Sequence, residues 1–276
     1  MKSLAMQDPK KKSLSRLFLK VFGIIVTVVL IGSISLLTFA PEARNMLLVK
    51  FFPVYARNAN FVKLTKNDQE IYLLGTIHSN HLTTKDYSLR HLKAVITNLK
   101  PDLVLVESRP EELQKDNWGD GPIEMPFASL TAKSLGMKVD GMDWWDSSNI
   151  GSLISDNGER DNRMAQNVLD RVTGHRKVLV LTGYSHVSEL VSRLKKQGYS
   201  EASFTNQEKD SLFITADIDS EFPPYFAFYI QKRIDIDRAS MEKETNPRAK
   251  AAYKNAIDTR EKFLKDFKAG KITTDG

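Results

Sequence analysis

The 276-residue chain contains no cysteine. Disulfide bonds and thiolate metal sites are therefore excluded. The absence of thiols also suits a domain that works outside the cytoplasm, where a stray cysteine is open to oxidation.

Little net charge remains once the N-terminus is set aside. Residues 1–20 carry six basic side chains and one acidic one, a net +5, so the formal charge of +6 leaves +1 for the rest of the chain. The basic residues are Lys2, Lys10, Lys11, Lys12, Arg16 and Lys20, and the acidic one is Asp8. The sequence pI of about 9.2 thus reports the N-terminal tail, and no nucleic-acid partner is expected.

Residues 21–41 contain no charged side chain and are long enough to cross about 30 Å of hydrocarbon. They predict a transmembrane anchor that follows a basic cytoplasmic tail, residues 1–20. The positive-inside rule places the N-terminus in the cytoplasm and the main domain outside it. The sequence therefore predicts a single-pass membrane protein whose membrane partner is bound through residues 21–41.

Two other interpretations of the apolar run are weaker. A cleavable signal peptide has a shorter apolar region, and Pro41 disfavours a cut after Ala40. A buried core helix rarely has this length beside a lysine cluster.

The juxtamembrane segment 42–60 alternates apolar and basic residues, which fits either an interfacial segment or ordinary helix packing.

Apolar runs and helical repeats alternate through the rest of the chain. Strands are predicted at 61–64, 70–74, 103–106, 137–142, 177–182 and 211–216, the first two as a hairpin with a polar turn. Helices are predicted at 84–99, 126–135, 160–172 and 188–197, and 110–125 is predicted to be a loop or lid. This alternation predicts an α/β domain at 61–221 with a mostly parallel sheet flanked by helices.

Beyond residue 221 the character of the sequence changes. Residues 222–230 are rich in aromatic side chains, and 247–269 have the charged, helical pattern of a long helix. We expect residues 222–276 to be an extension that packs on the same domain.

Four strand ends carry side chains suited to catalysis. The glycines Gly75 and Gly183 end two apolar runs, and each is followed three residues later by a histidine, His78 or His186. Two further runs end on Glu107 and Asp143. In a parallel sheet such positions lie at one edge, so we expect one convergent site in which the glycines permit close approach of the backbone.

These residue types have both functional and structural interpretations. The two histidines can act as general acid and base or as metal ligands, while Glu107 and Asp143 bind an ion or orient an imidazole. Arg160 can neutralise an oxyanion. The plainer interpretation is that each histidine is a hydrogen-bonded structural residue and that Arg160 is a solvated helix-start charge paired with Asp161. The combination at four strand ends favours chemistry.

The order of these motifs resembles a known superfamily. The runs Leu-Leu-Gly75-Thr-Ile-His78, Val-Leu-Val-Glu107, Glu159-Arg160-Asp-Asn-Arg-Met164-Ala165 and Thr-Gly183-Tyr-Ser-His186 are similar to those of the TraB/PrgY, GumN and TIKI superfamily, which is related in fold to ChaN and erythromycin esterase. The resemblance covers about residues 70–190. It implies an EreA/ChaN-like α/β core with His78, Glu107, Arg160 and His186 as the site, and TIKI members imply a metal-dependent peptidase.

The sequence thus predicts a membrane-anchored extracytoplasmic hydrolase that cuts a peptide, an amide or an ester. A divalent ion (Mn, Co or Zn) would be held by His78, Glu107 and His186; alternatively, one histidine acts directly as the base. A second hypothesis is a non-enzymatic regulatory module that captures a peptide signal or a haem-like ligand.

Overall fold

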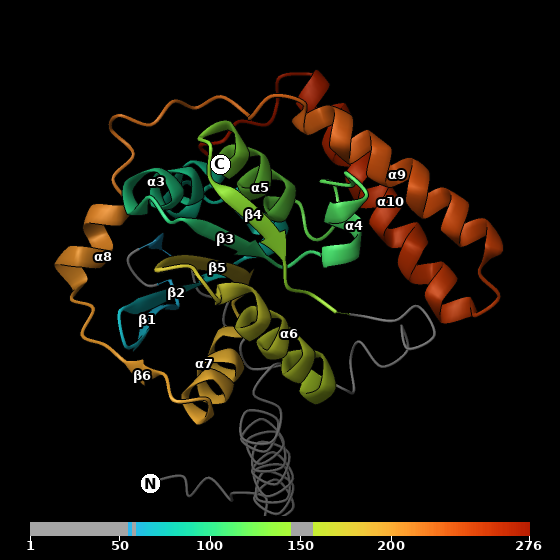
Figure 1. Ribbon diagram of the computed structural model, residues 1–276. Helices are drawn as coiled ribbons and strands as arrows, with labels where there is room; N and C mark the ends of the chain where they lie inside the picture. The colour runs from blue at the N-terminus through green and yellow to red at the C-terminus, as the bar shows by residue number, and fades with distance from the viewer. Residues whose placement is uncertain (1–54, 57–58, 145–156) are drawn as a thin grey trace, which may run out of the picture. The chain divides into compact units, whose positions relative to one another are not determined.

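A computed structural model describes residues 55–56, 59–144 and 157–276 (Figure 1). The predicted tail 1–20, the predicted anchor 21–41 and most of the segment 42–60 lie outside these residues. Within the described ranges, no helix combines the length and hydrophobicity that a membrane crossing requires.

Six strands form one mixed sheet in the order β4-β3-β5-β2-β1-β6. Their bounds are β1 Phe61–Lys66, β2 Gln69–Thr76, β3 Leu103–Val106, β4 Lys138–Gly141, β5 Lys177–Gly183 and β6 Ser200–Glu201. Strands β4, β3, β5 and β2 pair in parallel, whereas β1 pairs antiparallel with both β2 and β6. The predicted hairpin is confirmed, and its turn contains Asn67 in the left-handed region (φ 55°).

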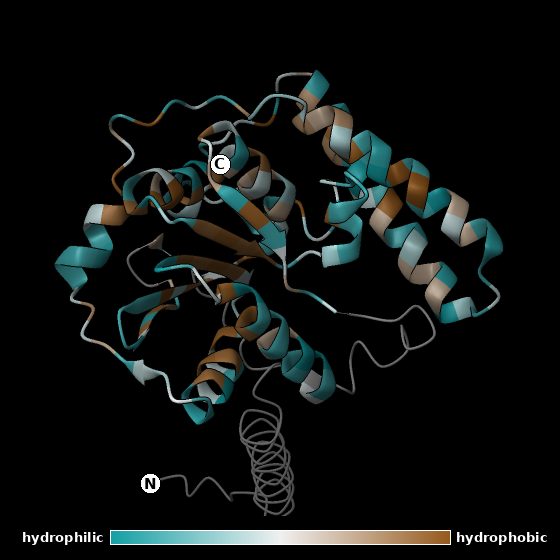
Figure 2. Cartoon of the chain, viewed as in Figure 1, coloured by the Kyte–Doolittle hydropathy of each residue, from teal (hydrophilic) through white to brown (hydrophobic). Residues whose placement is uncertain are grey.

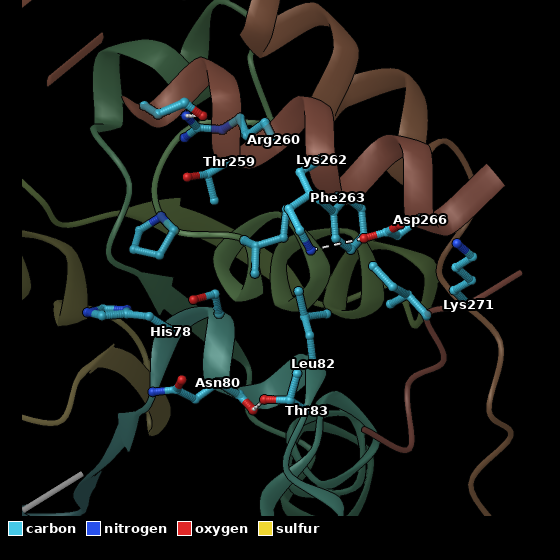
Figure 3. Close-up of a pocket in the computed structure, with 15 residues that line it drawn as sticks. His78, Asn80, Leu82, Thr83, Thr259, Arg260, Lys262, Phe263, Asp266 and Lys271 are labelled. Carbon is cyan, nitrogen blue, oxygen red and sulfur yellow. Dashed lines mark hydrogen bonds and ion pairs between the residues drawn. The ribbon is translucent and has the colours of Figure 1, made fainter. Parts of the chain in front are cut away.

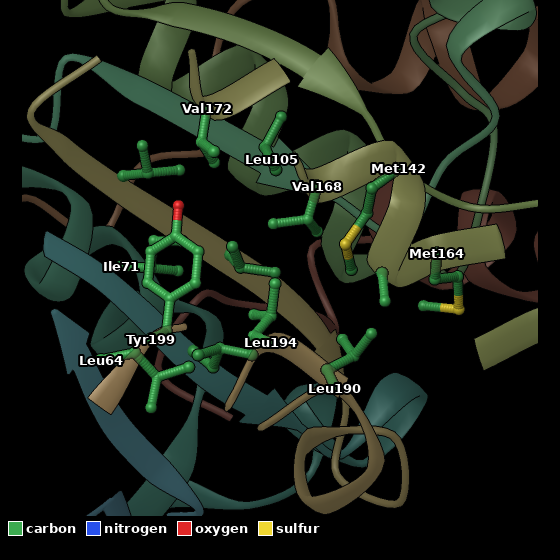
Figure 4. Close-up of a cluster of buried hydrophobic side chains, with 14 of the residues drawn as sticks. Leu64, Ile71, Leu105, Met142, Met164, Val168, Val172, Leu190, Leu194 and Tyr199 are labelled. Carbon is green, nitrogen blue, oxygen red and sulfur yellow. The ribbon is translucent and has the colours of Figure 1, made fainter. Parts of the chain in front are cut away.

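The central strands β3 and β5 are hydrophobic along almost their whole length (Figure 2). Every residue of β3 is buried, as is typical of parallel strands covered on both faces. Helices α6 (Asn157–Val172) and α7 (Val187–Lys196) cover one face. There Leu105 and Ile71 join Met164, Val168 and Leu194 in a single buried cluster (Figure 4).

The opposite face is covered by α3 (Leu89–Leu99) and α5 (Glu124–Ser134), which contact each other (Figure 1). The long helices α9 (Phe226–Lys243) and α10 (Pro247–Lys268) form a hairpin, and α9 contacts α5. Phe222 stacks on Phe226 and meets Phe263 and Phe267 edge-on. Phe222 and Phe226 also meet Phe127 of α5 and therefore pack this hairpin on the sheet domain, whereas Tyr225 and Phe228 of the same stretch are exposed.

Two local predictions are wrong, the strand at 211–216 and the loop at 110–125. The predicted strand 211–216 is replaced by α8 (Asn206–Leu212) and a turn, because Thr205 and Glu208 form a capping box that starts a helix. Phe213 then inserts its ring between Phe61 and Tyr87.

The predicted loop 110–125 contains the short helix α4 (Pro110–Gln114), and α5 begins at Glu124. Pro110 at the first helical position and the acidic residues Glu111 and Glu112 in the first turn are the signals that start α4.

Candidate active site

The carboxyl ends of four adjacent strands deliver the predicted residues to one edge of the sheet. His78 follows β2, Glu107 follows β3, Asp143 follows β4, and His186 follows β5. Arg160 reaches the same edge from the first turn of α6. The expected convergence is therefore present in the geometry.

Arg160 contacts three of the other site residues, Asp143, Glu107 and His186. Its Nε lies 2.8 Å from Asp143 Oδ1, and its Nη2 donates to Asp143 Oδ2 at 3.0 Å and to Glu107 Oε1 at 2.7 Å. The Arg160 side chain is 17% exposed, and both carboxylates are buried. Paired in this way, the guanidinium is a fixed positive charge rather than the solvated helix-start charge of the plainer interpretation.

Glu107 is fully engaged on both oxygens. Its Oε2 accepts from the Gly183 amide at 2.5 Å and from Thr182 Oγ1 at 2.9 Å, while Oε1 faces Arg160. Burial by itself raises the pKa of Glu107, but the positive charges of Arg160 and the histidines outweigh it and hold this pKa well below its usual range. Glu107 is therefore a carboxylate at any neutral pH.

His186 is buried beside Arg160. Its Nδ1 lies 2.6 Å from Asp161 Oδ1, and its Nε2 lies 3.3 Å from Arg160 Nη1. Burial lowers the pKa of His186, but Asp161 and Glu107 reverse this and raise it overall. When His186 is neutral, a proton on Nδ1 shared with Asp161 leaves Nε2 to accept from Arg160.

His78 has a different environment. Its Nδ1 lies 2.9 Å from Oε1 of Glu124, a fully buried carboxylate that also accepts from Thr76 Oγ1 at 2.7 Å. Burial favours neutral imidazole, but the Glu124 charge dominates and raises the pKa of His78 from 6.5 to about 9. The side chain is 49% exposed, and its Nε2 makes no hydrogen bond to any residue in the described ranges.

The backbone at His78 lies in the left-handed region, with φ 52°. This conformation is uncommon for a residue with a Cβ, although the chain also adopts it at Asn67 in a turn and at Lys100 after α3. The following 3-10 turn η2 (His78–Leu82) is held by His81, whose Nε2 accepts from the Ile77 amide at 3.0 Å. Burial lowers the pKa of His81 to about 4, so this neutral side chain is structural.

Both motif glycines are sites of close approach. A Cβ on Gly183 would lie 2.9 Å from the Cε1 and Nε2 atoms of His78, so the imidazole rests directly on the backbone of β5. A Cβ on Gly75 would lie 3.1 Å from the Cα of Tyr184. The sequence predicted that these glycines permit close approach of the backbone, and these distances describe that approach.

A cavity of about 380 Å³ opens over this edge of the sheet. His78, Glu107, Asp143 and Arg160 line one side, and the α9–α10 hairpin supplies Arg233, Asp237, Tyr253 and Arg260 on the other. His186 is not one of the lining residues; its side chain is 9% exposed. Only one of the two motif histidines therefore faces the cavity.

Buried ion pairs attach the α9–α10 hairpin to the chain that follows β3. Asp120 binds Arg109 at 2.9 Å and Arg233 at 2.6 Å, and Arg233 also pairs with Asp237 at 2.6 Å. Arg260 pairs with Asp237 at 3.1 Å. The C-terminal extension is thus part of the cavity wall, a contribution that the sequence pattern did not indicate.

The predicted metal ligands His78, Glu107 and His186 fit an ion poorly. Both oxygens of Glu107 have donors, and the Nε2 of His186 faces the guanidinium of Arg160, whose charge repels a cation. Nowhere in the described ranges are three or more histidine or carboxylate side chains grouped so that they suit a metal. Two of the three predicted ligands are therefore committed to other groups of the protein.

Sequence reasoning missed two carboxylates. Asp161 pairs with His186 rather than with Arg160, and its place beside the Glu159-Arg160 run was the only available signal. Glu124 lies 46 positions from His78 in a stretch predicted to be a loop, so no local pattern marked it. Each motif histidine thus has its own buried carboxylate.

Comparison of the chain with protein-family models, with curated proteins and with solved structures finds no match. The resemblance to the TraB/PrgY, GumN and TIKI superfamily therefore stays a prediction that rests on the four ordered motifs.

Proposed function

We propose that the protein is a hydrolase that cuts an ester or amide bond, a peptide bond included, with His78 as the general base. The observation that carries this proposal is the His78–Glu124 pair: a buried carboxylate fixes one imidazole nitrogen, and the other makes no hydrogen bond to any described residue and faces the cavity. The predicted membrane anchor and extracytoplasmic location, and the EreA/ChaN-like fold, belong to the same proposal.

In this mechanism, neutral His78 takes a proton at Nε2 from a water molecule whose oxygen attacks the substrate carbonyl carbon. The Glu124 carboxylate stabilises the imidazolium that forms, as the carboxylate of a catalytic triad does. The imidazolium then gives the proton to the leaving nitrogen or oxygen. The guanidinium of Arg160 lines the same cavity, and Nη1, the nitrogen that neither Glu107 nor Asp143 binds, donates to the oxyanion of the intermediate.

The remaining site residues hold the guanidinium of Arg160 in place. His186, oriented by Asp161, contacts Arg160 Nη1, while Asp143 and Glu107 bind the other nitrogens. We assign His186 and Asp161 as positioning residues, since neither lines the cavity.

The experiment that tests the proposal measures turnover by the full-length protein in a mild detergent. A panel of p-nitrophenyl esters and amino-acid anilides supplies both bond types. Release of many product molecules per protein molecule, saturable in substrate, is the expected result. Binding without turnover would instead favour the non-enzymatic regulatory module.

The metal hypothesis has a separate test. Because both oxygens of Glu107 already accept hydrogen bonds and Nε2 of His186 faces Arg160, Mn²⁺, Co²⁺ or Zn²⁺ is expected to shift the melting temperature of the wild-type protein no more than that of His78→Ala. Thermal unfolding with each ion measures this. A gain in wild type that disappears in His78→Ala would restore the predicted ion site.

The close contact between Gly183 and His78 gives a further prediction. Gly183→Ala adds a Cβ at 2.9 Å from the imidazole, which must shift from the position in which it contacts Glu124. We expect kcat/KM to fall about 10²-fold, the scale of an ångström-sized misplacement. Ser185→Ala in the same loop is the matched control, and an equal loss in both variants would contradict the role given to Gly183.

A further inference from the structure

A second cavity, of about 620 Å³, continues from the candidate active site. It shares His78, Pro122, Ala256 and Arg260 with the first cavity, so the two are adjacent and open to the same imidazole. One wall comes from η2 and the other from α10 with the residues that follow it (Figure 3). We name this second cavity the α10 groove.

The α10 groove has a largely apolar lining. Leu82 projects from η2, and Phe263 lies across from it on α10 (Figure 3). Pro122, Ile123, Ala256 and Ile272 complete the apolar surface. A volume of this size is typical of cavities that enclose a small organic ligand, and an apolar lining favours hydrocarbon groups.

The charged residues of the groove are mainly basic. Arg260, Lys262 and Lys271 line it against a single acidic residue, Asp266, which gives the lining a net charge of +2 without His78. Arg260 is bound to Asp237, and Lys262 to Asp266 at 3.1 Å. Lys271 is exposed and makes no ion pair with any residue that the structure describes, although its charge acts on the Asp266 carboxylate. It lies on the side of the groove away from His78 (Figure 3).

We propose that the α10 groove binds an apolar acyl chain that ends in a carboxylate, with the carboxylate at Lys271. The apolar walls match the chain, and the excess positive charge of the groove, with Lys271 at its edge, matches the anionic end. The carboxylate of Asp266 already pairs with Lys262, so a neutral chain would leave this excess charge in place. A polyanion such as a phosphate ester would be repelled by the Asp266 carboxylate and would fit the apolar walls poorly. As a substrate assignment, this inference rests on the proposed hydrolase function.

Binding of octanoate to the full-length protein in a nonionic detergent tests the inference. Saturation-transfer difference NMR, corrected with a detergent blank, gives Kd without any reaction. Octanoate is expected to bind about 2- to 5-fold more tightly than octanamide, which is the scale of one exposed ion pair. This preference should vanish in Lys271→Ala and persist in Lys268→Ala, a lysine of α10 that does not line the groove.

A second variant tests the apolar wall. Ile272→Asp places a carboxylate in the groove beyond the end of α10 and is expected to weaken octanoate binding at least about tenfold. The inference is overturned if octanoate and octanamide bind equally, or if Lys271→Ala and Lys268→Ala weaken binding alike. A protein that turns over esters but does not bind octanoate would refute the groove and leave the hydrolase; binding without turnover would do the opposite.

Discussion

Replacing His78 with alanine is expected to lower kcat/KM for ester or amide hydrolysis by about 10²- to 10⁴-fold, the contribution of a positioned general base. Its side chain is 49% exposed, but the change also removes the partner of the buried Glu124 carboxylate, so circular dichroism must first show that the variant is folded. Steady-state kinetics on wild-type and variant proteins measure the loss.

His175→Ala is the matched control for this variant. His175 also lies near a carboxylate, Asp102, at 3.4 Å, but it lines neither cavity. Its kcat/KM should equal that of wild type. A His78→Ala protein that is folded and retains wild-type turnover would contradict the assignment of His78 as the base.

Arg160→Leu is expected to destabilise the protein by about 3–5 kcal/mol, because it leaves the buried charges of Glu107 and Asp143 without their partner. Chemical denaturation, monitored by circular dichroism, measures the free energy of unfolding. The matched control is Arg163→Leu on the same helix. Arg163 is 59% exposed and pairs with Glu159, so its loss should change stability by about 0–1 kcal/mol.

A triple variant identifies the cause of the Arg160 effect. The triple variant combines Arg160→Leu with Glu107→Gln and Asp143→Asn. Neither of the two side chains that bound Arg160 is then charged. Much of the lost stability should therefore return. A triple variant as unstable as the single one would show that the loss comes from packing.

The sequence predicted the sheet well because its signals are local. Apolar runs such as Leu103–Val106 mark the strands, and the glycines Gly75 and Gly183 mark where β2 turns and β5 ends. Since consecutive parallel strands present their carboxyl ends at one edge, four site residues followed from topology alone. The short helices α4 and α8 were missed where loop-like or apolar composition concealed their start signals.

The pairing within the site could not be derived from sequence because it depends on side-chain contacts between distant elements. Glu124 meets His78 only because α5 packs with its first turn against the end of β2. The different environments of the two histidines arise in the same way: α6 covers His186 with Arg160, whereas the side chain of His78 is half-exposed. Two identical motifs therefore receive different roles from their surroundings.

The pKa of His78 and its dependence on Glu124 test the proposed mechanism most directly. The carboxylate raises this pKa to about 9, so the imidazole is mainly protonated at neutral pH and the base form increases as the pH rises. Stability from the pair follows the same titration: it is fully present below pH 6.5 and is lost as the pH rises through about 9. Glu124→Gln removes the charge and keeps the shape.

The decisive measurement is therefore the pH dependence of kcat/KM in wild type and in Glu124→Gln, with the His78 imidazole titrated by NMR in both proteins. Wild-type kcat/KM should rise to a plateau through an apparent pKa near 9 that equals the NMR value. In Glu124→Gln both values should move together to lower pH. A kinetic pKa that stays in place while the NMR pKa of His78 moves would show that another group is the base.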